Sequence, residues 1–126
     1  MNKTNIKSEF YGILSELEYY NISIVGIGNE NFNHTPLIAY NISGKIPLIV
    51  QNNIERFTEW LFFVKIYTDS SVQCTELSDD LDEKLMKLGF IELDFDDGYD
   101  KTSGKFYSNS LYSIKLDENG YSYTLK

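Results

Sequence analysis

The sequence predicts an α+β fold, in which a mostly antiparallel β-sheet of about six strands carries two to three helices on one face. The length of 126 residues is typical of one domain, so a single domain over residues 1–126 is expected. The composition is 42% hydrophobic and 15% aromatic, which is enough to form a core. Helical periodicity is confined to a few segments, and the other apolar runs are short, β-branched or aromatic, and separated by turn residues.

The first element is predicted to be an amphipathic helix that starts near Ile6 and ends near Tyr20. Apolar residues recur there at steps of three and four, and Thr4 is the expected N-cap. The β-branched residues 22–27 predict a strand, and the polar residues 28–35 predict a loop.

A β-hairpin is predicted next, with strands at residues 37–42 and 46–51 around Ser43-Gly44-Lys45, because glycine adopts the positive φ of a tight turn. Pro47 has no N–H group, so its strand is expected to lie at an edge of the sheet or to be irregular there. Residues 53–59 predict a short helical turn. The aromatic run at residues 60–68 is apolar on both faces at its start and predicts a central strand.

A second helix is predicted from an N-cap at Ser78 to a left-handed stop at Gly89, with Leu81, Leu85 and Leu88 buried. Its first turn would contain Asp79 and Asp80.

The last third of the chain predicts an alternating strand, a loop and a second hairpin. Ile91, Leu93 and Phe95 are expected to point inward from residues 90–95, with Glu92 and Asp94 outward. Residues 96–104 predict a loop. Strands at residues 105–116 and 121–125 are expected to pair through the Asn119-Gly120 turn.

The net charge of −8 is concentrated in one fifth of the sequence. Residues 76–100 contain ten carboxylates and two lysines, whereas the rest of the chain contains nine basic and nine acidic residues. A concentrated negative charge attracts cationic surfaces and repels nucleic acid and anionic lipid. We therefore expect no direct binding to DNA, RNA or membranes.

The residue types argue against the commonest catalytic and metal sites. The chain has one histidine, His34, and one cysteine, Cys74, which are too few for a zinc site of those ligands. No base stands near Cys74 in the sequence to activate it. Residues 94–105 resemble a calcium loop, but the glycine is at the fifth place and Lys105 is at the twelfth. We expect no cofactor, no metal and no enzymatic activity.

Each carboxylate in the acidic segment has a local explanation. Asp79 and Asp80 would favour the start of a helix, Glu92 and Asp94 would protect an edge strand, and the later aspartates would form a turn. These explanations leave open why so many like charges are retained with so little compensation. A role in attracting a partner is the functional alternative. Tyr99 joins the candidate surface because tyrosine is enriched in protein interfaces. The candidate partner-binding residues are Asp79, Asp82, Glu83, Glu92, Asp94, Asp96, Asp97, Tyr99 and Asp100.

In size, acidity and lack of an evident active site, the chain resembles bacterial immunity proteins that neutralise toxin domains. The resemblance implies a protein that caps the basic surface of a protein partner, with a nuclease domain as the toxin class. The single cysteine and the polar residues 1–9, which do not resemble a signal peptide, predict a cytoplasmic location. The chain also resembles phage-encoded anti-defence inhibitors that mimic nucleic acid, as some anti-CRISPR proteins do. A third alternative, from a different class, is a small enzyme or ligand-binding domain that uses carboxylates in a pocket.

Overall fold

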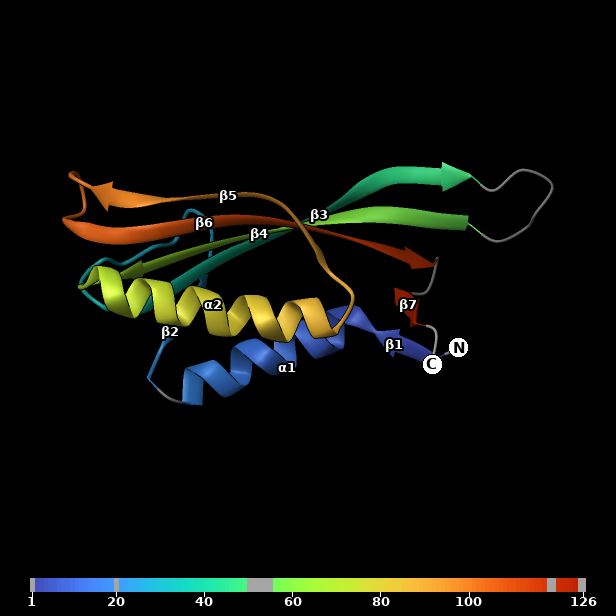
Figure 1. Ribbon diagram of the computed structural model, residues 1–126, viewed down its shortest axis with the longest axis horizontal. Coiled ribbons are helices and arrows are strands. Elements are labelled where there is room, and N and C mark those ends of the chain that lie inside the picture. Colours follow the sequence, from blue (N-terminus) through green and yellow to red (C-terminus); the bar gives the residue numbers. More distant parts are fainter. Residues whose placement is uncertain (1, 20, 50–55, 118–119, 125–126) are drawn as a thin grey trace.

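The computed structural model describes residues 2–19, 21–49, 56–117 and 120–124 (Figure 1). Side chains are described within these ranges except at residues 2–4, 18–19, 44–49, 56–57 and 122–124. The elements in chain order are β1 (Asn2–Asn5), α1 (Ile6–Tyr19), β2 (Ser23–Gly26), β3 (Leu37–Ile49), β4 (Arg56–Thr68), α2 (Ser71–Lys87), β5 (Ile91–Asp100), β6 (Lys105–Asp117) and β7 (Tyr121–Thr124).

The main sheet is mixed and has five strands in the order β2-β3-β4-β6-β5. β2 runs parallel to β3, and the other neighbours are antiparallel. β1 and β7 form a separate antiparallel pair. The α+β prediction is therefore confirmed, and the strand pairings are mostly antiparallel as predicted, but the strands form a five-stranded mixed sheet and a two-stranded ribbon instead of one sheet of about six strands.

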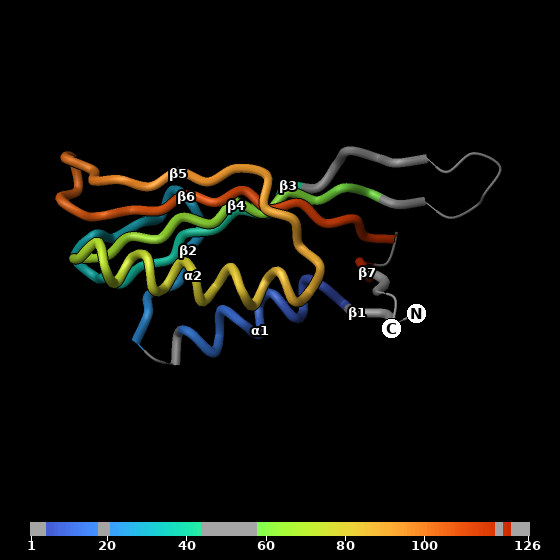
Figure 2. Tube along the Cα trace, in the orientation of Figure 1, coloured from blue at the N-terminus to red at the C-terminus, as the bar shows by residue number. Residues whose placement is uncertain are grey.

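Both helices pack on the same face of the main sheet, as the sequence predicted (Figures 1 and 2). The buried stripe of α1 includes Phe10 and Leu14, and that of α2 includes Leu81 and Leu85. The Phe10 ring meets the Phe62 ring of β4 edge to face, with the ring centroids 4.9 Å apart. One hydrophobic core therefore joins both helices to the centre of the sheet.

The helix boundaries confirm part of the prediction and correct the N-caps. The Asn5 side chain accepts a hydrogen bond from the Ser8 N–H group at 3.1 Å, so Asn5, and not Thr4, caps α1. α2 begins at Ser71, because the Ser70 hydroxyl accepts from the Gln73 N–H group at 3.0 Å. Ser78 is buried in the middle of α2, so the N-cap predicted there is wrong.

The predicted hairpin at residues 43–45 is wrong. β3 continues through these residues, and the pairing with β4 shifts between Gly44 and Ile46. The glycine thus lies at an irregularity of one long strand, which is a common site for it. Pro47 lies beyond the part of β3 that pairs with β2, which agrees with the edge prediction.

β4 lies between β3 and β6, so its predicted central position is confirmed. The helical turn predicted at residues 53–59 is wrong for residues 56–59, which belong to β4, and its other residues lie outside the described part of the chain.

β5 is a ten-residue edge strand, so the loop predicted at residues 96–104 is wrong for residues 96–100. The turn occupies residues 101–104, where Gly104 has a φ of 73°. Ile91 and Leu93 are 62% and 53% exposed, so their predicted inward position is wrong. Phe95 stands opposite the buried Ser110 and points toward α2 as predicted, although it is 45% exposed. The physical reason is that α2 packs against β4 and β6 and leaves the edge strand uncovered.

The second predicted hairpin is wrong in its partner. β7 pairs with β1 and not with β6, although Gly120 has the positive φ of 83° expected of a turn. Asn119 and Leu125 of that prediction lie outside the described residues.

Candidate acidic cleft

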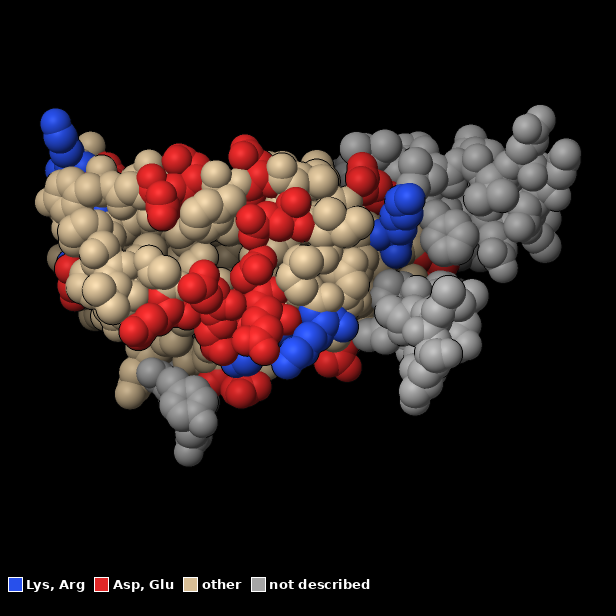
Figure 3. Space-filling model, in the orientation of Figure 1, with Lys and Arg blue, Asp and Glu red and all other residues tan. Residues whose placement is uncertain are grey.

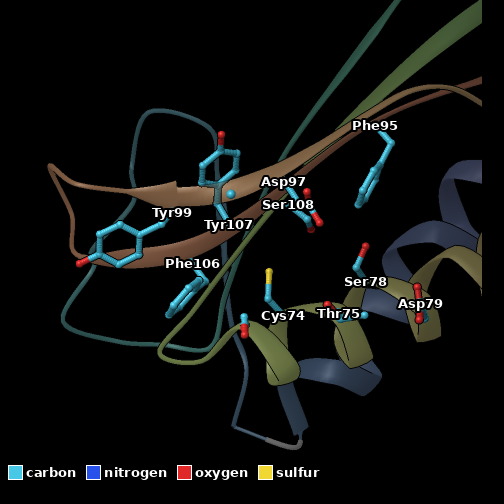
Figure 4. Close-up of a pocket in the computed structure, with 12 residues that line it drawn as sticks. Cys74, Thr75, Ser78, Asp79, Phe95, Asp97, Tyr99, Phe106, Tyr107 and Ser108 are labelled. Atoms are coloured by element: carbon cyan, nitrogen blue, oxygen red, sulfur yellow. The ribbon is translucent and has the colours of Figure 1, made fainter.

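A cleft of about 450 Å³ lies between α2 and the hairpin formed by β5 and β6 (Figure 4). It exists because α2 covers β4 and β6 but does not close over the edge strand. Residues from α2 form one wall, and residues from the hairpin form the other. Its volume falls in the range of sites that hold a small molecule or an inserted side chain.

Two carboxylates of α2 flank this opening. Leu81 and Leu85 direct the apolar stripe of the helix into the core, so Asp79 and Asp82, three residues apart, share the flank toward β5. Asp79 lines the cleft. Asp82 accepts a hydrogen bond from the Tyr112 hydroxyl of β6 at 2.8 Å.

The pairing of β5 with β6 determines which carboxylates of β5 face the helix. The helix-facing residues of β6 include Tyr112 and Ser108, which are buried, and Phe106, which is partly buried. Their partners on β5 are Glu92, Asp97 and Tyr99. Glu92 and Asp97 therefore lie on the same side of the sheet as α2, so the outward direction predicted for Glu92 is wrong. The register shift between Glu92 and Asp94 places Leu93 as the additional residue of the strand.

Other predicted site residues lie away from the cleft. Asp94 and Asp96 border a second hollow with Phe63, Lys65 and Asn109, and Asp96 accepts from the Tyr107 hydroxyl at 3.4 Å. Because residues 63 and 65 of β4 alternate with the buried residues 62 and 64, this hollow lies on the opposite face of the sheet. Asp100 stands opposite Lys105 at the end of the hairpin.

Ion pairs compensate only part of the acidic segment. Among the described residues, the ion pairs join Asp80 to Lys84 at 3.1 Å, Glu83 to Lys87 at 3.3 Å, and Asp69 to Lys105. Glu83, a predicted site residue, is thus paired within its own helix. No ion pair within the described part of the chain includes Asp79, Asp82, Glu92 or Asp97.

We call these four residues, Asp79, Asp82, Glu92 and Asp97, the acidic face. In the view of Figure 3, acidic side chains gather over α2 and along β5, with few basic side chains among them.

Within the acidic face, Glu92 has a raised pKa. Its pKa is raised first by burial, then by a hydrogen bond with Asp82 and by the negative charge of Asp82. The negative charge of Asp82 therefore disfavours the ionisation of Glu92 across the gap between helix and strand. Tyr112 donates to Asp82, and the pKa of Tyr112 is strongly raised by burial and by Asp82, so this donor keeps its proton.

Ser108 lies at the inner end of the cleft with an unsatisfied hydroxyl group. The residue is 2% exposed, and its Oγ atom has no hydrogen-bond partner among the described residues. A buried hydroxyl without a partner costs about 1–3 kcal/mol. Burial raises the pKa of the Cys74 thiol, and a smaller, opposite effect comes from the Ser108 hydroxyl acting as a donor toward the sulfur. The thiol hydrogen bonds to the Ile66 carbonyl at 3.9 Å, so it does not donate to Ser108.

Aromatic rings complete the walls of the cleft. Phe95 and Phe106 project from the hairpin toward α2, and Tyr99 lies at the end nearest the turn (Figure 4). The Tyr99 ring packs against the Phe106 ring with the centroids 5.1 Å apart. The cleft thus combines carboxylates near its opening, apolar aromatic walls and an unpaired hydroxyl inside.

The structure brings together five of the nine predicted site residues, namely the acidic face and Tyr99. It places Asp94 and Asp96 in another hollow, it places Asp100 beside Tyr99 in a hollow outside the cleft, and it pairs Glu83 with a lysine. Sequence reasoning missed Cys74, Ser108 and Phe106. The signal for the cleft was the alternation of Phe106, Ser108, Ser110 and Tyr112 along β6, because two small residues between two rings leave space on the inward face.

The described residues contain no group of three or more His, Cys, Asp or Glu side chains arranged to hold a metal ion. His34 lies in the segment between β2 and β3 and is not among the residues that line the cleft. No helix within the described ranges has the length and apolar character needed to cross a membrane.

Comparison with models of known protein families and with curated proteins found no match to this chain.

Proposed function

We propose that this chain is a non-catalytic binding protein that uses its acidic face to cap the basic surface of a protein partner. We further propose that it acts as an immunity-type inhibitor, with a nuclease toxin domain as the partner. The observation that carries this proposal is the close approach of two carboxyl groups, Asp82 of α2 and Glu92 of β5, without a lysine or arginine paired to either among the described residues.

The energetics of this contact support a cationic partner. Two neighbouring carboxylates repel each other in the free chain, and a guanidinium or ammonium group placed between them would remove that repulsion. The same field accelerates association with a basic surface before any contact is made. A nuclease matches this requirement because its substrate groove must be basic to bind phosphates.

The cleft itself supports binding more than catalysis. Its one nucleophile of high intrinsic reactivity, Cys74, is buried, and burial raises the pKa of the thiol, so the reactive thiolate is disfavoured. No histidine stands among the lining residues to act as a base.

The test is the rate of association with a basic nuclease domain, starting with the protein encoded beside this chain's gene. The double variant Asp79→Asn with Asp97→Asn removes two charges from the acidic face. The control, Glu9→Gln with Glu16→Gln, removes two exposed charges from α1. We expect the first variant to slow association about tenfold in about 50 mM salt and to lose inhibition of the nuclease, and the control to behave as the parent chain.

Salt provides the second criterion. The association rate of the parent chain should fall steeply between about 50 and 300 mM salt, because the Debye length shortens over that range. Rates that are independent of salt, or equal slowing by both double variants, would show that the acidic face does not guide binding.

A further inference from the structure

We propose that the cleft between α2 and the β5–β6 hairpin is an anchor site for the guanidinium group of an arginine side chain. The proposal rests on the proposed function, and it names the group that the basic partner inserts. It is carried by the unsatisfied hydroxyl of Ser108 at the inner end of a cleft whose opening is flanked by Asp79 and Asp97.

The unsatisfied Ser108 hydroxyl is the observation that points to a ligand. Most buried hydroxyl groups in proteins are hydrogen bonded, so an unpaired one that lines a cleft calls for an explanation. The group can accept as well as donate. Cys74 does not donate to it, because the thiol hydrogen bonds to the Ile66 carbonyl, so the acceptor sites of the hydroxyl stay open. A donor group that enters the cleft from outside would complete the missing hydrogen bond.

The carboxylates determine the charge of that donor. Asp97 stands directly opposite Ser108 in the β5–β6 pairing, and Asp79 reaches the cleft from α2. Neither takes part in an ion pair within the described residues. Two carboxylates and one hydroxyl together offer several acceptors and a negative field, which suits a cation with many N–H donors.

The aromatic walls select a guanidinium group over a metal ion. Phe95, Tyr99 and Phe106 supply π faces, on which a planar guanidinium stacks favourably. These rings provide no metal ligands, and the described residues contain no group suited to a metal ion. The methylene stem of arginine would lie along the same apolar walls. Arginine therefore matches the charge, the donors and the walls of the site together.

The experiment is an NMR titration of the ¹⁵N-labelled chain with Nα-acetyl-arginine amide. The expected result is saturable shifts at the amides of Thr75, Asp97 and Ser108. The matched control ligand is Nα-acetyl-citrulline amide, which has nearly the same shape but no charge. We expect it to bind at least about tenfold more weakly, because hydrogen bonds between charged partners are lost.

Two variants test the location of the site. Thr75→Tyr fills the opening from an exposed position of α2 and leaves every charge in place, so the saturable shifts should disappear. Ser108→Ala removes only the inner acceptor and should weaken binding about three- to tenfold. The control Glu9→Gln with Glu16→Gln should bind as the parent chain does.

Shifts that survive in Thr75→Tyr, or equal binding of the citrulline compound, would overturn the anchor site. In that case a salt-dependent association that is still slowed by Asp79→Asn with Asp97→Asn would leave the proposed function standing. Saturable, charge-dependent binding that Thr75→Tyr abolishes would support the anchor even if no nuclease is inhibited.

Discussion

Tyr112 of β6 donates its hydroxyl hydrogen to Asp82 of α2 at 2.8 Å, and Glu92 of β5 also interacts with Asp82. This small group of side chains couples the charge of the acidic face to the stability of the fold. Tyr112 and Glu92 therefore both interact with Asp82. Burial and the negative charge of Asp82 raise the pKa of Glu92 above its ordinary value of 4.5.

The direction of the shift predicts the pH dependence of Glu92→Gln. Glu92 binds its proton more tightly in the folded chain than in the unfolded chain, so its ionisation weakens the fold as the pH rises through the folded-state pKa. At pH 7 the variant should be more stable than the parent by about 0.5 kcal/mol, a value reduced by solvent screening because the side chain is exposed.

Urea unfolding of both chains at a series of pH values measures this difference. The gain should vanish once the pH falls below the ordinary glutamate value, where both side chains are neutral. Glu16→Gln on the exposed side of α1 is the control and should show no such trend. A gain that persists unchanged at low pH would rule out the carboxylate repulsion as its cause.

The secondary structure elements show which predictions local sequence can support. The apolar stripe of α2 was read correctly at Leu81 and Leu85, and Gly89 ends the helix region with a φ of 101°. The start was misplaced because Ser70 and Ser78 are both acceptable N-caps. Cys74 and Ser78 continue the buried stripe toward the N-terminus at the same spacing, and this periodicity was the better signal.

The errors in the strands have a different cause, which is that pairing between distant segments overrides local turn propensity. Residues 96–100 contain aspartates and a glycine, a composition typical of a turn, yet their pairing with β6 keeps them in a strand. In the same way, pairing with β4 carries β3 through Gly44. Neither partner strand is specified by residues near the turn, so local patterns did not reveal these registers.

Two glycines allow a paired prediction at this scale. Gly89→Ala places a Cβ atom on a backbone with φ of 101°, so the free energy of unfolding should fall by about 1–2 kcal/mol. Gly12→Ala lies inside α1 with nothing within 4 Å of the added Cβ, so it should raise that free energy by about 0.5–1 kcal/mol. Thermal or urea unfolding gives both values. Equal effects of the two substitutions would contradict the assigned end of α2.

At the scale of the whole molecule, the fold changes the explanation of the acidic residues. Asp79 and Asp80 lie in the middle of α2, and the first turn of that helix contains no acidic residue. The helix dipole therefore does not account for them. Asp80 is paired with Lys84, whereas Asp79 faces the cleft. Because the helix dipole does not explain Asp79, the alternative that this residue attracts a cationic partner is favoured.

The candidate site was predictable only in part. The concentration of charge in residues 76–100 was visible in the sequence, and it led to the acidic face. The inner end of the cleft was not visible, because Cys74 and Ser108 are 34 positions apart and meet only when α2 packs beside the hairpin. Carboxylates such as Asp94 and Asp96 were assigned to the same surface, but the alternation of β5 places them on the other face of the sheet.

The central claim is that the four carboxylates of the acidic face produce one negative field beside the cleft. Paramagnetic relaxation of backbone amide protons by a cationic and by a neutral soluble probe measures this field directly. We predict the largest ratio of cationic to neutral relaxation at residues 79–83 and 92–97, with a much smaller ratio at residues 9–16 of α1. Equal ratios in these three segments would contradict the account.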